Sequence, residues 1–107
     1  MAEPRIIKKY PNRRLYDTTE SRYITLEDVR RLVAEGKGFT VVEQRTGRNI
    51  TRLVLLQVIS ELEQESARIL SEPMLMMLVQ SYNNPDNIQL VTELETTLRR
   101  SRNAPQA

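Results

Sequence analysis

The stretch Lys8-Lys9-Tyr10-Pro11-Asn12-Arg13-Arg14-Leu15-Tyr16-Asp17-Thr18 places four cations, two tyrosines and an amide around a single turn signal. Pro11 presets φ to about −65° for the second position of a β-turn, and Asn12 is tolerated at the third position. The flanking residues, 5–10 and 14–18, are therefore expected to form two antiparallel strands.

The second predicted strand alternates between two faces, with Tyr16 and Thr18 on one face and Leu15 and Asp17 on the other. Tyr16 is expected to belong to the core, with its hydroxyl at the surface. An acid just before a polar turn usually accepts backbone N–H bonds or pairs with a nearby arginine. We therefore predict a structural role for Asp17 rather than a catalytic one.

A two-stranded ribbon bent at this turn presents Lys8, Lys9, Arg13 and Arg14 close together. Such a ribbon fits the major groove of DNA, where arginine can fork onto guanine and asparagine onto adenine. Exposed edge strands also carry Lys and Arg to block edge-to-edge pairing, so the cations alone leave both interpretations open. Three of the four tyrosines lie in residues 10–23, and this interleaving of aromatic and basic residues favours nucleic-acid binding.

The sequence KKYPNRRLYDT at 8–18 is followed by SRYITLED at 21–28. Together they resemble the signature of the N-terminal DNA-binding domain of bacterial polyhydroxyalkanoate accumulation regulators. The similarity continues through Thr46-Gly47 and Ile50-Thr51-Arg52 to residues 54–59, and it covers residues 6–65. It implies a transcriptional repressor of polyhydroxyalkanoate storage genes, whose relatives can also associate with the polymer granule.

The composition narrows the possible functions. A chain of 107 residues fits one domain. Residues 1–55 hold 12 Lys and Arg against seven Asp and Glu, whereas residues 56–107 hold four against seven. The basic half indicates a polyanionic partner such as nucleic acid, bound in a salt-dependent way. The chain has no Cys and no His, so we expect no disulfide, no Cys/His zinc site, no cofactor and no enzymatic activity.

Targeting signals are also missing from the sequence. Residues 1–5 lack the hydrophobic centre of a signal peptide, and no apolar run approaches the ~18 to 20 residues that span a bilayer. We therefore expect a cytoplasmic protein that does not insert into membranes.

Thr25 is a favoured N-cap, because its hydroxyl can accept from the backbone N–H of Asp28 while the Asp28 carboxylate reciprocates. This pattern predicts a helix over residues 26–35 that ends at Gly36. The apolar residues spaced for its buried stripe are Leu26, Val29, Leu32 and Val33. Residues 39–45 are β-branched and predict a strand, where a helix-turn-helix protein would place its recognition helix.

Thr51 is expected to cap a second helix. Its main apolar face is predicted to carry Leu55, Val58, Ile59 and Leu62, widened by Leu53, Val54 and Leu56. Arg45, Arg48 and Arg52 cluster around the start of this helix, where the helix dipole favours an anion. They form a second candidate phosphate contact, with a solvated turn as the alternative.

Two further helices are predicted in the C-terminal half. Ser71 caps the first, with Pro73 in its first turn, and residues 74–79 are apolar all round. Such a helix must be buried on several sides, and a second copy of the chain is the expected cover. We expect the methionines of this helix to pack in the core or at a dimer interface, which is their more frequent role. A ligand-binding groove is the alternative. After residues 83–85, apolar residues spaced three, three and four apart indicate the second helix.

These patterns predict an α+β fold, with a small N-terminal antiparallel sheet and one intervening helix, followed by a helical half that forms a dimer or higher homo-oligomer. Residues 1–65 are expected to bind double-stranded DNA, and residues 66–107 to mediate oligomerisation and effector binding, within one compact unit. The DNA-binding candidates are Lys8, Lys9, Tyr10, Asn12, Arg13, Arg14, Arg22, Arg48 and Arg52. The oligomerisation or effector candidates are Met74, Met77, Leu78, Val91, Leu94 and Leu98. The alternative function is a granule-surface or protein-interaction module that uses these apolar helices without DNA.

Overall fold

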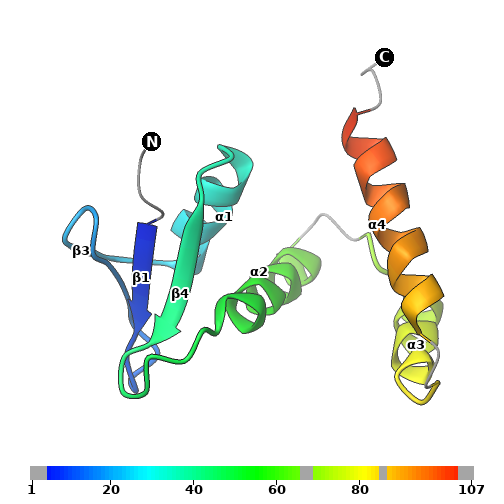
Figure 1. Ribbon diagram of the computed structural model, residues 1–107, viewed down its shortest axis with the longest axis horizontal. Coiled ribbons are helices and arrows are strands. Elements are labelled where there is room, and N and C mark those ends of the chain that lie inside the picture. Colours follow the sequence, from blue (N-terminus) through cyan, green and yellow to red (C-terminus); the bar gives the residue numbers. More distant parts are fainter. Residues whose placement is uncertain (1–4, 66–68, 85–86, 104–107) are drawn as a thin grey trace. The chain divides into compact units, whose positions relative to one another are not determined.

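The computed structural model describes residues 5–65, 69–84 and 87–103, and it divides the chain into two compact units, Met1–Arg68 and Ile69–Ala107. The first unit contains β1 (Arg5–Lys9), β2 (Leu15–Asp17), β3 (Arg22–Ile24), α1 (Leu26–Ala34), β4 (Phe39–Glu43) and α2 (Thr51–Glu65) (Figure 1). The second contains α3 (Glu72–Ser81) and α4 (Ile88–Asn103). This division lies close to the boundary expected at residue 65.

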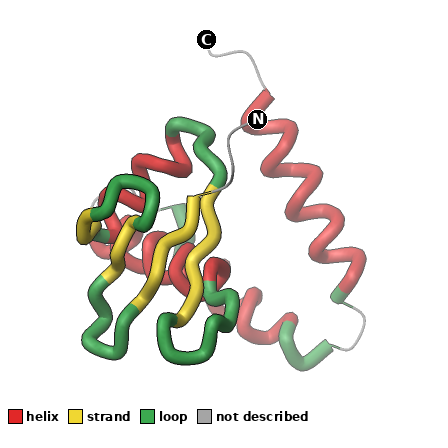
Figure 2. Tube along the Cα trace, turned by 60° about the vertical axis from the view of Figure 1, so that its left-hand side comes forward, coloured by secondary structure: helices red, strands yellow, loops and turns green. Residues whose placement is uncertain are grey.

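The four strands form one sheet in the order β3-β2-β1-β4, with the helices of the N-terminal unit on one side (Figure 2). β1 pairs antiparallel with β2, as the sequence predicts, and β2 pairs antiparallel with β3. β4 instead runs parallel to β1, with Ile7 opposite Val41, so the sheet is mixed rather than antiparallel. A connection between parallel strands needs a crossover, and α1 supplies it between β3 and β4.

The core lies between the sheet and the two helices α1 and α2. Its buried side chains are Ile7, Leu15, Ile24, Val29, Leu32, Val41, Ile50, Val54 and Val58. Burying one such aliphatic side chain stabilises a fold by roughly 1.5 to 3 kcal/mol. This cluster therefore supplies the main stabilisation of the N-terminal unit.

The opposite face of the sheet carries an aromatic cluster. Tyr16 lies on this face, opposite Lys8 on β1 and Tyr23 on β3. Its ring meets that of Tyr23 edge to face at 5.2 Å, and Tyr10 lies 6.4 Å from Tyr23. Tyr16 is only half-buried, so its predicted place in the core is wrong. The alternation itself is confirmed, because Leu15 and Asp17 are buried on the other face.

Helix α1 begins as predicted. Thr25 accepts a hydrogen bond from the backbone N–H of Asp28, and the Asp28 carboxylate accepts from the backbone N–H of Thr25. The helix ends at Ala34, just before Gly36, whose φ of +71° is the left-handed conformation that favours glycine. Val33 is 52% exposed, so it does not belong to the predicted buried stripe.

Helix α2 is rotated relative to the prediction. Thr51 is its first residue rather than its cap, since the Thr51 hydroxyl accepts from the Val41 N–H at 2.9 Å and donates to the Asn49 side chain at 2.7 Å. These bonds fix the helix against β4 so that Val54 and Val58 are buried. The predicted apolar face of this helix is therefore only partly correct. Three residues assigned to it are exposed, namely Leu53, Leu56 and Ile59.

The C-terminal unit confirms both predicted helices. Ser71 caps α3 by accepting from the Met74 N–H at 3.2 Å, and Pro73 lies in the first turn. No residue of α3 is buried, and the apolar side chains of α4 are exposed except for the partly buried Leu90. Among the described residues, no helix is long and apolar enough to cross a membrane.

Candidate nucleic-acid interface

The hairpin between β1 and β2 confirms the predicted turn. The Arg13 N–H donates to the Tyr10 carbonyl at 2.9 Å, and the Tyr10 N–H donates to the Arg14 carbonyl at 2.9 Å. The side-chain oxygen of Asn12 accepts from the Arg14 N–H at 3.1 Å. Bidentate recognition of adenine needs both the oxygen and the NH₂ of an asparagine, and this oxygen is already engaged in the hairpin.

Arg13 has a φ of +68°, in the left-handed region. This conformation costs an L-residue about 1–2 kcal/mol, and glycine avoids that cost. The shape of the loop therefore gives no reason for an arginine at this position. Backbone strain of this kind tends to collect at functional sites, where the side chain is needed.

The parallel pairing of β1 and β4 brings two loops to the same end of the sheet. The Gln44 N–H donates to the Lys9 carbonyl at 2.9 Å, which places residues 44–49 beside the hairpin loop, 10–14. An open hollow of about 570 Å³ lies between them, lined among others by Lys9, Arg13 and Arg45. The two predicted groups of basic residues thus belong to one surface.

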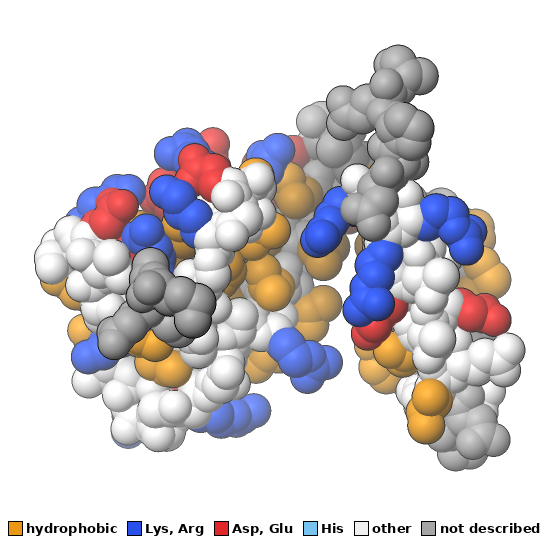
Figure 3. Space-filling model, turned by 45° about the horizontal axis from the view of Figure 1, so that its top comes forward, with side chains coloured by type: hydrophobic (Ala, Val, Ile, Leu, Met, Phe, Trp, Pro, Cys, Tyr) orange, Lys and Arg blue, Asp and Glu red, His pale blue; other side chains and the backbone are white. Residues whose placement is uncertain are grey.

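We call this surface the basic end. Its cations are Lys8, Lys9, Arg13, Arg14, Arg45, Arg48 and Arg52, and all but the partly buried Lys9 are exposed. Within the described residues, none of them forms an ion pair. The nearby Glu43 accepts a hydrogen bond from the Thr46 hydroxyl at 2.7 Å. Figure 3 shows Lys and Arg side chains without acidic neighbours along the lower edge of the N-terminal unit.

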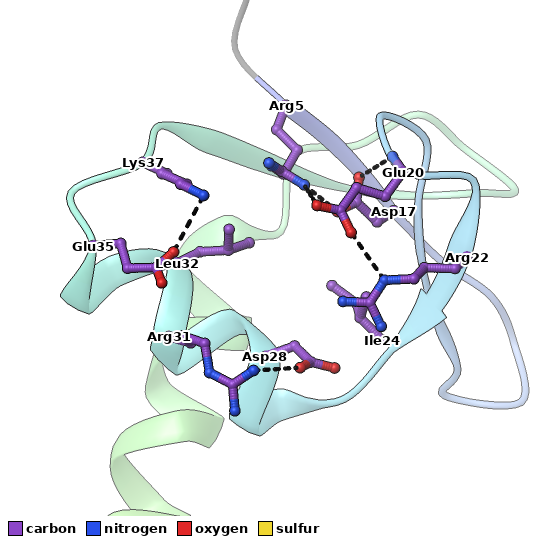
Figure 4. Close-up of a pocket in the computed structure, with 10 residues that line it drawn as sticks. All are labelled: Arg5, Asp17, Glu20, Arg22, Ile24, Asp28, Arg31, Leu32, Glu35 and Lys37. Carbon is purple, nitrogen blue, oxygen red and sulfur yellow. Dashed lines mark hydrogen bonds and ion pairs between the residues drawn. The ribbon is translucent and has the colours of Figure 1, made fainter.

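The opposite end of the sheet also carries cations, but each of them has an acidic partner (Figure 4). We call it the paired end. Its ion pairs are Arg5 with Asp17 and Glu20, Arg22 with Glu20 at 2.9 Å, Arg31 with Asp28 at 3.7 Å, and Lys37 with Glu35 at 3.3 Å. Arg22 was predicted to bind DNA, but the structure places it here and not at the basic end.

Asp17 is the centre of the paired end. It is 2% exposed, pairs with Arg5, and accepts hydrogen bonds from the backbone N–H groups of Thr19 at 2.9 Å and Glu20 at 3.3 Å. Its predicted structural role is confirmed.

Two carboxyl groups of the paired end have altered acidities. The hydrogen bond from Arg22 and its positive charge lower the pKa of Glu20. The hydrogen bond from the Thr25 backbone lowers the pKa of Asp28. Both groups are therefore held in the charged form by their local partners.

The predicted contact residues did not include Tyr23, and Arg45 was predicted only as a phosphate contact at the start of the second helix. The guanidinium carbon of Arg14 lies over the Tyr23 ring, 4.0 Å from its centroid. Arg45 joins the hairpin only through the parallel pairing of β4 with β1. Both contacts depend on strand pairing, so the local sequence carried no signal for them beyond the charge of Arg45.

Residues 6–66 match the PHB/PHA accumulation regulator DNA-binding domain family. The chain belongs to this family. The predicted resemblance is thereby confirmed. The matched segment holds the basic end and, apart from Arg5, the paired end, and it ends before α3. The family is described as a DNA-binding domain of accumulation regulators.

Two relatives of this regulator domain are each 45% identical to the chain over 98 residues. One is an uncharacterized protein of Allochromatium vinosum, and the other is an uncharacterized protein in the phbA 5′ region of Thiocystis violacea. The alignments cover 92% of this chain but 64% and 71% of the relatives, respectively. No solved structure matches the chain.

Proposed function

We propose that this protein is a cytoplasmic, sequence-specific repressor of polyhydroxyalkanoate storage genes that binds double-stranded DNA through its basic end. The observation that carries the proposal is the contrast in charge pairing. Among the described residues, the cations of the basic end have no acidic partner, whereas those of the paired end all have one. Unpaired cations can replace the counterions of DNA phosphates, and the released counterions drive binding.

The cations of the basic end make two kinds of contact with DNA. Arg13 and Arg14, at the tip of the hairpin, contact base edges, where a bidentate pair contributes about 1–3 kcal/mol of discrimination. Lys8, Lys9, Arg48 and Arg52 contact phosphates together with Arg45. Tyr10 and the free NH₂ group of Asn12 complete the contact surface of the hairpin.

The descriptions of the family and of one relative support polyhydroxyalkanoate genes as the target. The family is described as a regulator of PHB/PHA accumulation, and the Thiocystis violacea relative is described as a protein in the phbA 5′ region. A repressor of such genes would bind near their promoters and be released when storage is required.

The C-terminal unit supports a homodimer. Met74, Met77, Val91, Leu94 and Leu98 are between 39% and 68% exposed, and Leu78 is partly buried. Apolar helices without a buried partner are stabilised by a second copy, and a two-fold dimer reads two half-sites. A polyhydroxyalkanoate polymer or granule surface would compete for the same side chains. Linkage then requires the polymer and the DNA to weaken each other equally if polymer binding opens the dimer.

The same exposed helices favour the alternative function, a granule-surface module without DNA binding. Retention on heparin or DNA at increasing salt separates the two functions. A DNA-binding protein elutes late, and its affinity falls steeply with salt. A granule-surface module would elute early, with little dependence on salt.

A pair of double variants tests the basic end. Arg13→Ala with Arg14→Ala should abolish binding to a duplex that the wild-type protein selects from a random pool, and leave thermal melting nearly unchanged. Arg31→Ala with Lys37→Ala removes the same charge from the paired end and should bind that duplex like the parent in a mobility-shift assay. Equal losses in both would show that net charge is responsible, and the proposal would then be wrong.

The dimer has its own test. Met77→Asp should yield monomers in sedimentation, because burying an unpaired charge is costly. It should also weaken binding to two half-sites more than binding to one. Gln80→Asp adds the same charge at another exposed position of α3 and should stay dimeric. A dimeric Met77→Asp protein with unchanged DNA binding would exclude α3 as the interface.

A further inference from the structure

Arg14 and Arg13 are adjacent in the hairpin, yet their side chains have different surroundings. The central carbon of the Arg14 guanidinium lies over the Tyr23 ring, 4.0 Å from the ring centroid. Arg13 is exposed, and no ring contact or ion pair is found for it within the described residues. One arginine is held by the sheet, and the other projects freely from the loop.

The Tyr23 ring is itself fixed on two sides. Tyr16 meets it edge to face, at 5.2 Å and 77°, and Tyr10 lies 6.4 Å away. Tyr23 is still 49% exposed, so the cluster lies at the surface and is not part of the core. The pairing of β2 with β3 explains the position of the Tyr23 ring, because Tyr23 lies directly opposite Tyr16 in this register.

The backbone of Arg14 is fixed as well. Its N–H donates to the Asn12 side chain at 3.1 Å, and its carbonyl accepts from the Tyr10 N–H at 2.9 Å. Both the start and the end of the Arg14 side chain are therefore held in place.

The hydrogen-bonding edge of the Arg14 guanidinium is available to a partner. Its five N–H donors form a planar fork, and none of them makes a hydrogen bond or ion pair within the described residues. An acidic partner would occupy those donors, but Arg14 has none among the described residues. The guanidinium is thus prepared for a planar acceptor pair such as guanine O6 and N7.

We infer that Tyr23 is a positioning residue, which holds the Arg14 guanidinium in the orientation for bidentate contact with guanine. The inference rests on the proposed function and adds a residue that touches no base itself. Holding a flexible side chain in its bound conformation reduces the entropy lost on binding. Tyr23 therefore contributes to specific affinity through Arg14, and little to the sequence-independent attraction of phosphates.

A double-mutant cycle tests this, using the selected duplex and a scrambled duplex of equal length. Arg14→Ala should weaken binding to the selected duplex by about ten- to a hundredfold. Tyr23→Leu should weaken it by roughly two- to fivefold, the scale of an exposed cation–π contact, and leave the scrambled duplex unaffected. The variant with both changes should bind no worse than Arg14→Ala alone, because the two residues act as one unit.

Two controls separate positioning from a general structural role. Tyr23→Phe keeps the ring and should retain wild-type affinity. Tyr23→Leu combined with Arg13→Ala should show losses that multiply, since Arg13 does not touch the ring. The inference is wrong if the losses of Tyr23→Leu and Arg14→Ala multiply, or if Tyr23→Phe binds as weakly as Tyr23→Leu.

The outcome also distinguishes the inference from the proposed function. If Arg14→Ala binds like the parent while other variants of the basic end lose affinity, Tyr23 positions nothing and the proposed function stands. If Tyr23→Leu does not fold, Arg14→Lys replaces it, because an ammonium keeps the charge but cannot fork. Arg14→Lys should bind the selected duplex as weakly as Arg14→Ala does, and it should bind the scrambled duplex with unchanged affinity. Unchanged affinity for both duplexes would refute the inference.

Discussion

The two ends of the N-terminal sheet differ in how they use the same kind of residue. At the paired end, Arg5, Arg22, Arg31 and Lys37 each lie within 4 Å of a carboxylate. At the basic end, the Lys and Arg side chains have no such partner among the residues that the structure describes. Cations that are neutralised inside the protein support the fold, whereas unpaired ones are available to a polyanion.

The net charge of +2 hides this division, because it averages over both ends and over the acidic C-terminal half. The paired end forms where the start of β1, the turn between β2 and β3, and α1 meet. The basic end forms where the hairpin and the loop before α2 meet. The comparison predicts that substitutions at the paired end change stability and that those at the basic end change DNA binding.

The largest expected effect is that of Asp17→Ala on stability. It removes a buried acceptor of two backbone N–H groups, and a hydrogen bond to a charged group contributes about 1.5–3 kcal/mol. We expect the free energy of unfolding in urea to fall by about 3 kcal/mol or more. Glu35→Ala, which breaks the exposed pair with Lys37, should change it little. Equal stability of the two variants would contradict a structural role for the paired end.

Arg13→Gly should have opposite effects on stability and on binding. Glycine relieves the left-handed strain, so we expect a gain of about 0.5–1 kcal/mol in the free energy of unfolding. The loss of the guanidinium should at the same time weaken binding to the selected duplex. Arg13→Asn, which tolerates the same φ, should behave similarly. If either variant binds like the parent, Arg13 is not a contact residue.

The smallest effect is the response to acid, and it belongs to the paired end. The pKa values of Glu20 and Asp28 are lowered in the folded protein, so their contribution is complete above the unfolded pKa and is lost as pH falls through the folded pKa. Urea unfolding should therefore show stability declining below about pH 4. Glu20→Gln and Asp28→Asn should each flatten this decline, and an unchanged profile would assign the acid response to other groups.

The sequence predicted the elements well where a local signal decides them. The Pro11-Asn12 turn, the Thr25 cap and the Ser71 cap depend on bonds between residues at most four apart, and all three are present. The sequence-based prediction was wrong for Tyr16 and in part for α2. The periodicity of a strand or helix shows which residues share a face, but it does not show which face another element covers. The hydroxyl of Thr51 fixed the rotation of α2 by a contact ten residues away in sequence.

The candidate site divides in the same way. The sequence alone determined the basic composition of the N-terminal half, the hairpin with Arg13 and Arg14 at its tip, and the family signature. Only the tertiary structure decided which cations stay unpaired, that Arg22 belongs to the paired end, and that Arg14 lies on Tyr23. The physical reason is that charge pairing and stacking act over a few ångströms in space, and strand pairing sets which distant residues come within that range.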